Sequence, residues 1–522
     1  MEAKHVVAVA GGGKTTYLVA KIKEAMRNAS QDKIIAVTYT RNMAKELKQK
    51  IGATLKYCGT LHHILYALLS ERYPGRYMSI VAEMENADIV ADIGLRLKIN
   101  GASPALLAKV LGQPEYKLTY LERLFKKQYV KYFDANRIIS YPLIEIYGSK
   151  LIGEGEWDYL FVDEYQDMSI DNINVLAGIN AKHKMYVYDP MQSIYGFRGA
   201  RPDLLPRGQE ILGKSYRCPS AISDLANHLL VFSKDEYPVQ MEPAVQGGEL
   251  VIVKGQDPKD HYAELRGIID GLLEKYTPGE IVILGRTNKI LEDAQTKLEG
   301  IPFQKVSAQV LSSGEMLAFK YLLRLMVVKD DYNVIRFAKA AKLISKESAA
   351  LSDYIDPLSG QPTVKGATAA GSIRGMPVFQ SIMKSMEIQP IPAAARNMME
   401  CIPGRDWIID ECEKIISWLC LYYGRDYEKI ENALSEMDTD ALVGNDDRIK
   451  LMTVHTAKGL EYKAVVIVNV YNGVFPHFNA DAKEELRLFY VAITRAKETC
   501  VILQSGVHTW LDNYSQPLAM EE

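Results

Sequence analysis

The first 60 residues alternate between short apolar runs and stretches with a helical repeat of apolar and polar positions. An apolar run from Val6 to Ala10 is followed by three glycines and then by a helical period from Thr15 to Met26. A second apolar run, Ile34 to Thr38, precedes a lysine-rich helical stretch from about Asn42 to Ile51. Short apolar runs that alternate with helices are typical of strands buried in a parallel sheet. The opening pattern therefore predicts an α/β fold.

This alternation is interrupted twice further along the chain. From about Leu69 to Lys150 the pattern is helical, and strand character resumes from Tyr159 to Val162. Another α/β block begins near Gly208 and is itself interrupted before its last strands. Its predicted strands are 250–253, 281–284, 449–454 and 464–470, and the interruption contains a Gly-, Pro-, Ala- and Met-rich stretch at 352–403 and an acidic stretch at 425–447. We therefore expect sheet domains that carry inserts.

Within the first insert, the segment from Tyr116 to Arg137 interleaves basic and aromatic residues. Its cations are Lys117, Arg123, Lys126, Lys127, Lys131 and Arg137, and its aromatic residues include Tyr120, Phe125, Tyr129, Tyr132 and Phe133. Such a pattern fits a groove for single-stranded nucleic acid. It also fits an amphipathic helix whose aromatic rings lie in the core and whose lysines lie in water, and we favour this second interpretation.

Length and charge narrow the class of protein. The 522 residues correspond to roughly three or four domains at about 150 residues each. With 62 Lys and Arg against 65 Asp and Glu, the net charge of −3 excludes a nucleic-acid binder held by bulk positive charge. The charge is uneven, however, because residues 1–58 hold 11 basic against 4 acidic residues, whereas residues 425–447 hold 2 against 8. A nucleic acid would therefore be held locally.

The six cysteines are scattered without the paired spacing of metal ligands, so we expect a reducing compartment, no disulfide and no zinc site. No apolar run approaches the roughly 20 residues needed to span a bilayer, and the N-terminus lacks the pattern of a signal peptide. We expect a cytoplasmic protein with no membrane partner.

The segment from Ala8 to Thr15 (AVAGGGKT) fits a phosphate-binding loop, except that Ala8 stands where the usual pattern begins with glycine. Glycines allow backbone N–H groups to turn toward phosphates, a lysine neutralises the β and γ oxygens, and a threonine hydroxyl can hold Mg²⁺. A strand is predicted before this loop and a helix after it, which supports the assignment. The predicted nucleotide-binding residues of the loop are Ala10, Gly11, Gly12, Gly13, Lys14, Thr15 and Thr16.

Two adjacent carboxylates follow the predicted strand that ends at Val162. A phosphate loop needs a carboxylate on the metal side of the site, and Asp163 is positioned in sequence to hold Mg²⁺ together with Thr15. Glu164 is the candidate general base that orients and deprotonates an attacking water. This pair favours hydrolysis over transfer to a bound acceptor.

Two longer motifs are Asp163–Asp167 (DEYQD) and Gln192–Ala200 (QSIYGFRGA). They closely resemble motifs of the UvrD, Rep and PcrA branch of superfamily 1 helicases. Further motifs follow in the family's order at 36–40 (AVTYT), 59–62 (GTLH), 215–217 (SYR), 453–461 (TVHTAKGLE) and 488–496 (LFYVAITRA). A small-molecule kinase also uses a phosphate loop, but it would not explain these later motifs.

The resemblance implies two RecA-like cores with parallel sheets, each interrupted by a mostly helical subdomain, and with ATP bound between the cores. In this chain the first core would comprise 1–68 and 150–208, with an insert at 69–149; the second core would comprise 209–338 and 445–522, with a reduced insert at 339–444. The family also implies roles for residues that match its motifs. Gln192 would sense the γ-phosphate, Tyr216 would stack on adenine and Glu461 would bind the ribose. Arg217 and Arg495 would come from the second core to stabilise charge on the transferring phosphoryl group.

The same resemblance implies a path for single-stranded DNA over both cores. The residues that match the family's DNA contacts are Tyr39, His62, Phe197, Arg198 and His455. An aromatic ring such as Phe197 stacks on bases without regard to sequence. The implied function is an ATP- and Mg²⁺-dependent translocase and 3′ to 5′ helicase acting in repair, recombination or replication, in a bacterial or phage-infected cell. Its partners would be single-stranded and tailed duplex DNA and repair or replication proteins, and the isolated protein would be a monomer.

An alternative is a helicase-like accessory factor whose ATP cycle regulates DNA binding, with weak or no strand separation. Several departures from the family bear on this choice. Only seven residues precede Ala8, so the family's glutamine motif for adenine is missing, and Leu486 replaces one of two adjacent arginines. Both inserts are reduced, and about 27 residues follow Arg495. We expect translocation to be retained while unwinding is weak or depends on a partner.

Overall fold

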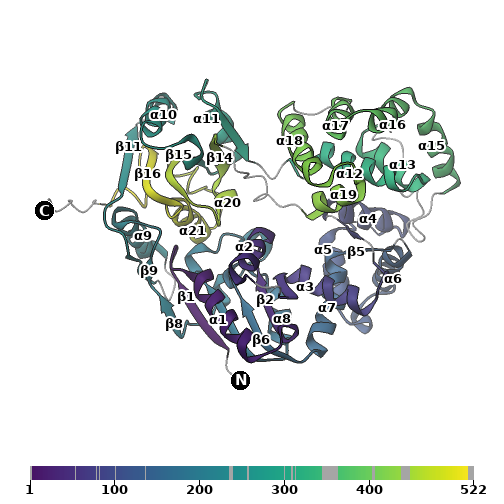
Figure 1. The fold of residues 1–522 in the computed structure, drawn as a ribbon, viewed down its shortest axis with the longest axis horizontal. Coiled ribbons are helices and arrows are strands. Elements are labelled where there is room, and N and C mark those ends of the chain that lie inside the picture. Colours follow the sequence, from purple (N-terminus) through teal and green to yellow (C-terminus); the bar gives the residue numbers. More distant parts are fainter. Residues whose placement is uncertain are drawn as a thin grey trace. The chain divides into compact units, whose positions relative to one another are not determined.

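A computed structural model of the chain shows two compact units (Figure 1). The first unit comprises residues 1–64, 153–307 and 439–522, and the second comprises 65–152 and 308–438. Helices α3 (Leu61–Arg72) and α7 (Tyr141–Glu154) run across the boundaries between them. The structure describes residues 3–52, 55–77, 79–81, 83–99, 101–135, 137–233, 239–255, 258–298, 300–306, 310–311, 313–343, 363–401, 406–436 and 447–514.

The first unit contains two six-stranded parallel sheets, as the sequence pattern predicts. The first sheet has the strand order β3-β2-β6-β7-β1-β8. All five residues of the inner strand β2 are apolar or small and buried, as expected for a strand covered on both faces of the sheet. Leu18 and Ile22 of α1 and Leu47 of α2 pack against one face of this sheet. The elements are β1 (Lys4–Ala8), α1 (Lys14–Asn28), β2 (Ile34–Thr38), α2 (Arg41–Ile51), β3 (Tyr57–Thr60), β6 (Trp157–Val162), α8 (Ile170–Gly178), β7 (Ala181–Tyr188) and β8 (Glu210–Leu212).

The second sheet has the order β11-β16-β15-β12-β14-β13. Along β15, Ala464, Val466 and Val468 belong to one apolar core, whereas Val465 and Ile467 belong to the other, because successive side chains point to opposite faces. Helices α10 and α11 contact one core, and α9 and α21 contact the other. Strands β9 (Lys214–Ser215) and β10 (Glu242–Pro243) pair with each other in a separate two-stranded sheet. The other elements of this core are α9 (Ser220–Ser233), β11 (Glu249–Gly255), α10 (Pro258–Leu273), β12 (Ile281–Gly285), α11 (Asn288–Gln295), β13 (Phe303–Val306), β14 (Ile449–Thr453), α20 (Val454–Ala457), β15 (Tyr462–Val470), α21 (Ala482–Ile493) and β16 (Ala496–Ser505).

The second unit is mostly helical and combines residues 65–152 with residues 308–438. A buried hydrogen bond joins these two segments, from Arg336 Nη2 to Tyr132 Oη at 3.0 Å. Within the second segment, Arg324 and Glu431 form a largely buried ion pair at 2.8 Å. The elements are β4 (Ser79–Val81), α4 (Glu83–Arg96), α5 (Pro104–Gly112), α6 (Tyr120–Ala135), β5 (Ile138–Ser140), α12 (Gly314–Val327), α13 (Asp331–Ala340), α15 (Val364–Arg374), α16 (Pro377–Ile388), α17 (Ile391–Glu400), α18 (Asp406–Tyr423) and α19 (Tyr427–Glu436).

The structure moves the boundary of the second insert and decides between the two interpretations of the basic and aromatic segment. Helices α12 and α13 pack with the helices of the second unit, so the unit boundary falls near residue 308, whereas the pattern placed the insert from residue 339. In α6, Phe125, Tyr129, Tyr132 and Phe133 are all buried, which confirms the interpretation as an amphipathic helix for these four rings. Parts of the 352–403 and 425–447 stretches lie outside the described residues. Among the helices that the structure describes, none is long and apolar enough to cross a membrane.

Candidate active site

The phosphate loop joins the end of β1 to the start of α1. Gly13 immediately precedes the helix and has a φ of +75°, a left-handed conformation that glycine adopts without steric cost. A Cβ on Gly12 would lie 2.9 Å from the carbonyl oxygens of both Val9 and Leu212, so only glycine fits there. The loop therefore presents the N-terminus of a 15-residue helix, where N–H groups and the helix dipole favour phosphate.

Asp163 and Glu164 follow β6 and lie beside this loop. Thr15 donates a hydrogen bond from its hydroxyl to Asp163 Oδ2 at 3.1 Å, and the Glu164 N–H donates to Asp163 Oδ1 at 3.0 Å. Burial and the neighbouring Glu164 raise the pKa of Asp163 to about 7. Burial alone would also raise the pKa of Glu164, but the cations Lys14 and Lys458 outweigh it and hold that pKa below its usual value. The cations around Glu164 therefore favour its ionised form, which is the form that a general base requires.

A buried polar network continues from these carboxylates toward Gln192. Gln166 donates to Glu164 Oε2 and accepts a hydrogen bond from the Asp189 N–H at 3.1 Å. Gln192 in turn donates to Asp189 Oδ2 at 2.6 Å. Because these groups are buried and hydrogen-bonded to one another, Glu164 and Gln192 are held in fixed positions.

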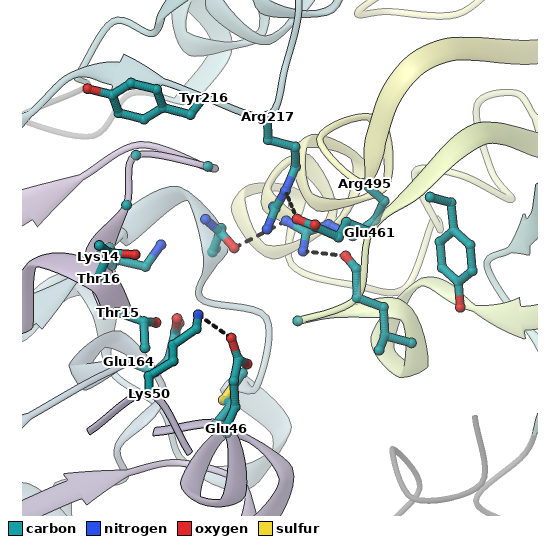
Figure 2. Close-up of a pocket in the computed structure, with 18 of the residues that line it drawn as sticks. Lys14, Thr15, Thr16, Glu46, Lys50, Glu164, Tyr216, Arg217, Glu461 and Arg495 are labelled. Carbon is teal, nitrogen blue, oxygen red and sulfur yellow. Dashed lines mark hydrogen bonds and ion pairs between the residues drawn. The ribbon is translucent and has the colours of Figure 1, made fainter. Parts of the chain in front are cut away.

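The second sheet contributes a set of charged side chains to the same site. Arg495 Nη2 donates to Gln192 Oε1 at 3.2 Å, and Arg495 Nη1 donates to the Leu460 carbonyl at 3.1 Å. Burial and the adjacent Arg217 lower the pKa of Arg495 to about 9, which leaves it charged at neutral pH. Arg217 forms an ion pair with Glu461 at 2.8 Å. Figure 2 shows Lys14 and Thr15 on one side of the cleft and Arg217, Glu461 and Arg495 on the other.

These side chains line one cleft of about 920 Å³. The lining includes, among the residues predicted from sequence, Gly11, Gly12, Gly13, Lys14, Thr15, Thr16, Asp163, Glu164, Gln192, Tyr216, Arg217, Glu461 and Arg495. Tyr216 lies at the edge with two thirds of its surface exposed, and its N–H donates to the Gly11 carbonyl at 3.0 Å. An exposed ring attached to the phosphate loop in this way is available to stack on a base.

Lys458 is an important residue that the sequence reasoning did not single out. Its ammonium group is buried, forms an ion pair with Asp167 and donates to the Gln192 carbonyl. It also lies 4.8 Å from the centre of the Tyr195 ring. Burial and Glu164 raise the pKa of Asp167 to about 7, against the opposing effect of Lys458. The signal was present in the sequence, because Lys458 lies inside the TVHTAKGLE motif.

We expect Lys458→Met to lower the free energy of unfolding by about 3–5 kcal/mol, because it leaves a buried carboxylate without its cation. Without Lys458, the pKa of Asp167 rises further above its unfolded value, so the variant should lose more stability as pH increases above about 4. Urea unfolding at pH 6 and pH 8 measures both effects. The double variant Lys458→Met/Asp167→Asn should recover most of the loss and abolish its pH dependence. An equal loss in the single and double variants would contradict this account.

A row of aromatic side chains runs beside the cleft from the first core to the second. The rings of Tyr39 and Tyr195 are stacked at 5.0 Å, Tyr195 and Phe197 are 6.0 Å apart, and Phe197 and His455 meet edge to face at 5.6 Å. Arg198 lies over the rings of Tyr195 and Phe197. The structure thus brings four of the five predicted DNA residues together and adds Tyr195, while His62 lies in the first turn of α3.

Two further contacts fix the loop that carries these rings. Arg487 Nε donates to the Ser193 carbonyl at 2.7 Å, and Glu484 Oε1 accepts a hydrogen bond from the Gly196 N–H at 3.1 Å. A Cβ on Gly196 would lie 2.5 Å from Glu484 Oε2, so a larger residue there would displace the Glu484 carboxylate from this contact. Leu486, where the family has an arginine, is buried in the apolar core of the second sheet. The polar contact with the loop is made by Arg487.

The two parallel sheets, the phosphate loop and the paired carboxylates define a P-loop nucleotide-binding protein with two RecA-like cores. Comparison of the sequence with models of known protein families narrows this class further. The family model described as an AAA domain matches residues 2–198, and that of the UvrD-like helicase C-terminal domain matches residues 426–505.

Curated relatives match almost the whole chain. A probable DNA helicase II homolog of Mycoplasma capricolum is 23% identical over an alignment of 606 positions, gaps included. This alignment covers 95% of this chain and 81% of the relative. The ATP-dependent DNA helicase Rep of Buchnera aphidicola is 23% identical over 616 residues, covering 94% and 91%. The ATP-dependent DNA helicase PcrA of Staphylococcus epidermidis is 23% identical over 592 residues, covering 95% and 80%. These matches confirm the predicted resemblance to the UvrD, Rep and PcrA branch of superfamily 1, and with it the enzyme class, an ATP hydrolase of the helicase type.

Proposed function

We propose that this protein is an ATP-dependent translocase on single-stranded DNA and a 3′ to 5′ DNA helicase, which acts in repair, recombination or replication. The observation that carries the proposal is the loop from Gln192 to Arg198. At one end, Gln192 lines the nucleotide cleft and contacts Arg495. At the other end, Phe197 and Arg198 belong to the aromatic row. One short segment therefore joins a nucleotide site to a surface suited to bases.

In the proposed hydrolysis, Glu164 accepts the proton of the attacking water while Gln192 orients the water and the γ-phosphate. Lys14 neutralises phosphate oxygens, and Arg217 and Arg495 stabilise the charge that develops on the transferring group. Tyr216 stacks on the base and Glu461 binds the ribose. Since Arg495 comes from the second core and the phosphate loop from the first, we expect hydrolysis to require the cleft to be closed around the nucleotide.

The oxygen donors beside the phosphate loop fit Mg²⁺. The Thr15 hydroxyl and the Asp163 carboxylate are already 3.1 Å apart, and Mg²⁺ in nucleotide sites takes one or two protein oxygens together with phosphate oxygens and water. A cation would also offset the charge of the buried carboxylates Asp163 and Glu164. When bound, Mg²⁺ supplies charge neutralisation at the β- and γ-phosphates. Thr15 and Asp163 would hold it.

The coupling between the nucleotide and the strand follows from the contacts of the Gln192 to Arg198 loop. Lys458, Arg495, Arg487 and Glu484 all come from the second core and all contact this loop. When ATP closes the cleft, these side chains move with the second core and shift the loop and its rings. Bases stacked on the aromatic row would then pass from one ring to the next, which is movement along a strand.

We expect Phe197→Ala to weaken binding to single-stranded DNA roughly 5- to 150-fold, because a base loses about 1–3 kcal/mol of stacking. Phe197→Trp should restore the affinity, since it keeps a ring. Fluorescence anisotropy with a labelled oligonucleotide measures both. Phe478→Ala is the matched control, because Phe478 is also a highly exposed phenylalanine of the second core. Equal weakening in the two alanine variants would argue against a specific role for Phe197.

The function is tested by ATPase activity with and without single-stranded DNA, together with unwinding of 3′-tailed and 5′-tailed duplexes. The proposal requires hydrolysis stimulated by DNA, displacement of a block at the 5′ end of a single strand, and a preference for the 3′ tail. DNA binding that responds to ATP without displacement of the block would instead identify the accessory factor. Preference for the 5′ tail would overturn the proposed polarity.

A further inference from the structure

Helix α18 of the second unit has apolar residues on two faces, of which only one is used in folding. Its inner face packs in the helical unit and is buried; the members of this face are Ile409, Cys412, Ile415, Ile416 and Leu419. On the outer face, Trp418 is 46%, Leu421 84% and Tyr422 69% exposed. The fold as described leaves this apolar surface in contact with water, which is unfavourable. A clustered exposure of this kind marks an interaction surface.

Trp418, Leu421 and Tyr422 form an exposed apolar stripe near the end of α18. Positions 410, 414, 418 and 421 follow the helical repeat, so Asp410 and Lys414 place charged groups on the same side of the helix as Trp418 and Leu421. A groove beside the stripe has a volume of about 480 Å³ and is lined by Asp410, Glu413, Lys414, Ser417, Trp418 and Leu421. The Trp418 and Tyr422 rings meet at 5.1 Å. An aromatic ring beside carboxylates is a suitable site for a cationic side chain.

The end of α18 is held firmly in place. Arg425, just beyond the helix, donates to the Gln389 carbonyl at 2.7 Å, and Tyr427 donates to the Met386 carbonyl at 3.2 Å. These bonds attach the end of α18 to the end of α16. The apolar stripe is therefore a preformed surface, which lowers the entropic cost of binding a partner.

The charge around the stripe selects the kind of partner. Arg396 is shared by the carboxylates of Glu400, Asp410 and Glu413, at 3.0, 2.9 and 2.6 Å, so the cluster keeps an excess of negative charge. With Lys414, which pairs with Glu411 at 2.6 Å, the described cluster holds four carboxylates and two cations. A surface of this charge repels nucleic acid and attracts cations.

We propose that this outer face of α18, with its groove, docks a basic amphipathic helix of another protein. Apolar side chains of the partner would pack on Leu421 and Tyr422, and a lysine or arginine would lie over Trp418 beside Asp410 and Glu413. The proposal is independent of the ATP and DNA sites, because the stripe shares no residue with either.

The test uses the full-length protein and a fluorescein-labelled 14-residue peptide with two repeats of LKKLLKL as the probe. We expect saturable binding that weakens at least about tenfold in Trp418→Ala/Leu421→Ser and also weakens in Asp410→Asn/Glu413→Gln. Val364→Ser is the matched control, because Val364 is an equally exposed apolar residue of the same unit, at 88%. It should leave binding unchanged. Stimulated ATPase activity should be the same in all variants.

Three results would overturn the proposal. They are the absence of binding, equal binding to a scrambled peptide of the same composition, and equal weakening by Val364→Ser. Light scattering after size-exclusion chromatography tests whether a second copy of this chain occupies the stripe instead. If the wild type is a dimer and Trp418→Ala/Leu421→Ser is a monomer, the stripe binds a second copy of this chain and the proposed partner is wrong.

Discussion

Glu164→Gln should lower kcat for ATP hydrolysis by about 10²- to 10⁴-fold while nucleotide affinity changes little. The substitution keeps the size of the side chain and its hydrogen bond with Gln166, but it removes the only group at that position able to accept a proton from water. Lys14 and Thr15, which are expected to bind the phosphates, are unaffected. Steady-state hydrolysis with saturating single-stranded DNA and titration with a fluorescent ATP analogue measure the two parts of this prediction.

Glu46→Gln provides the matched control for this experiment. Glu46 also lines the cleft but forms an ion pair with Lys50 on α2. The same loss of one negative charge from the cleft wall should therefore leave hydrolysis within a few-fold of the wild type. DNA-stimulated hydrolysis that persists in Glu164→Gln would remove Glu164 from the role of general base.

Arg495→Lys should lower kcat by about 10³-fold or more, the range associated with arginines that stabilise a transferring phosphoryl group. Lysine keeps the positive charge but lacks the planar set of donors with which Arg495 contacts Gln192, Leu460 and Val491. DNA affinity without nucleotide should be retained, because the aromatic row is intact. Rapid-quench measurement of a single turnover isolates the chemical step.

A buried arginine is also a structural residue, so stability must be measured alongside the rate. Arg324→Lys makes the same substitution in the largely buried ion pair with Glu431, in the second unit. It should lower the unfolding midpoint by a similar amount without a comparable loss of kcat. If both variants lose activity in proportion to their loss of stability, the effect of Arg495→Lys is one of folding and not of catalysis.

Short sequence patterns predicted those features whose conformation is decided by residues close together in the chain. The glycine loop before a helical period, and the carboxylates directly after an apolar run, are short-range signals with a direct physical cause. The structure places Lys14, Asp163 and Arg495 in one cleft, although more than 300 residues separate the second from the third along the chain. Only the family's motif order linked them beforehand.

The remaining features depend on packing between distant segments. Helices α12 and α13 have no local mark that assigns them to the second unit, because their apolar faces would suit either a core or an insert. The hydrogen bond from the Gly196 N–H to Glu484 joins residues 288 positions apart, and nothing in either short segment predicts the other. Tyr195 and Lys458 were available within quoted motifs, but their contact is visible only once the two cores are folded.

The loop from Gln192 to Arg198 is held largely through its main chain. Lys458 binds the carbonyl of residue 192, Arg487 the carbonyl of residue 193, and Glu484 the N–H of residue 196. Contacts to backbone atoms do not depend on which side chains the loop exposes to solvent. We therefore expect substitutions at positions 197 and 198 to leave the loop attached to the nucleotide cleft. If the proposed DNA path is right, the strength with which bases are held can be altered without disturbing that attachment.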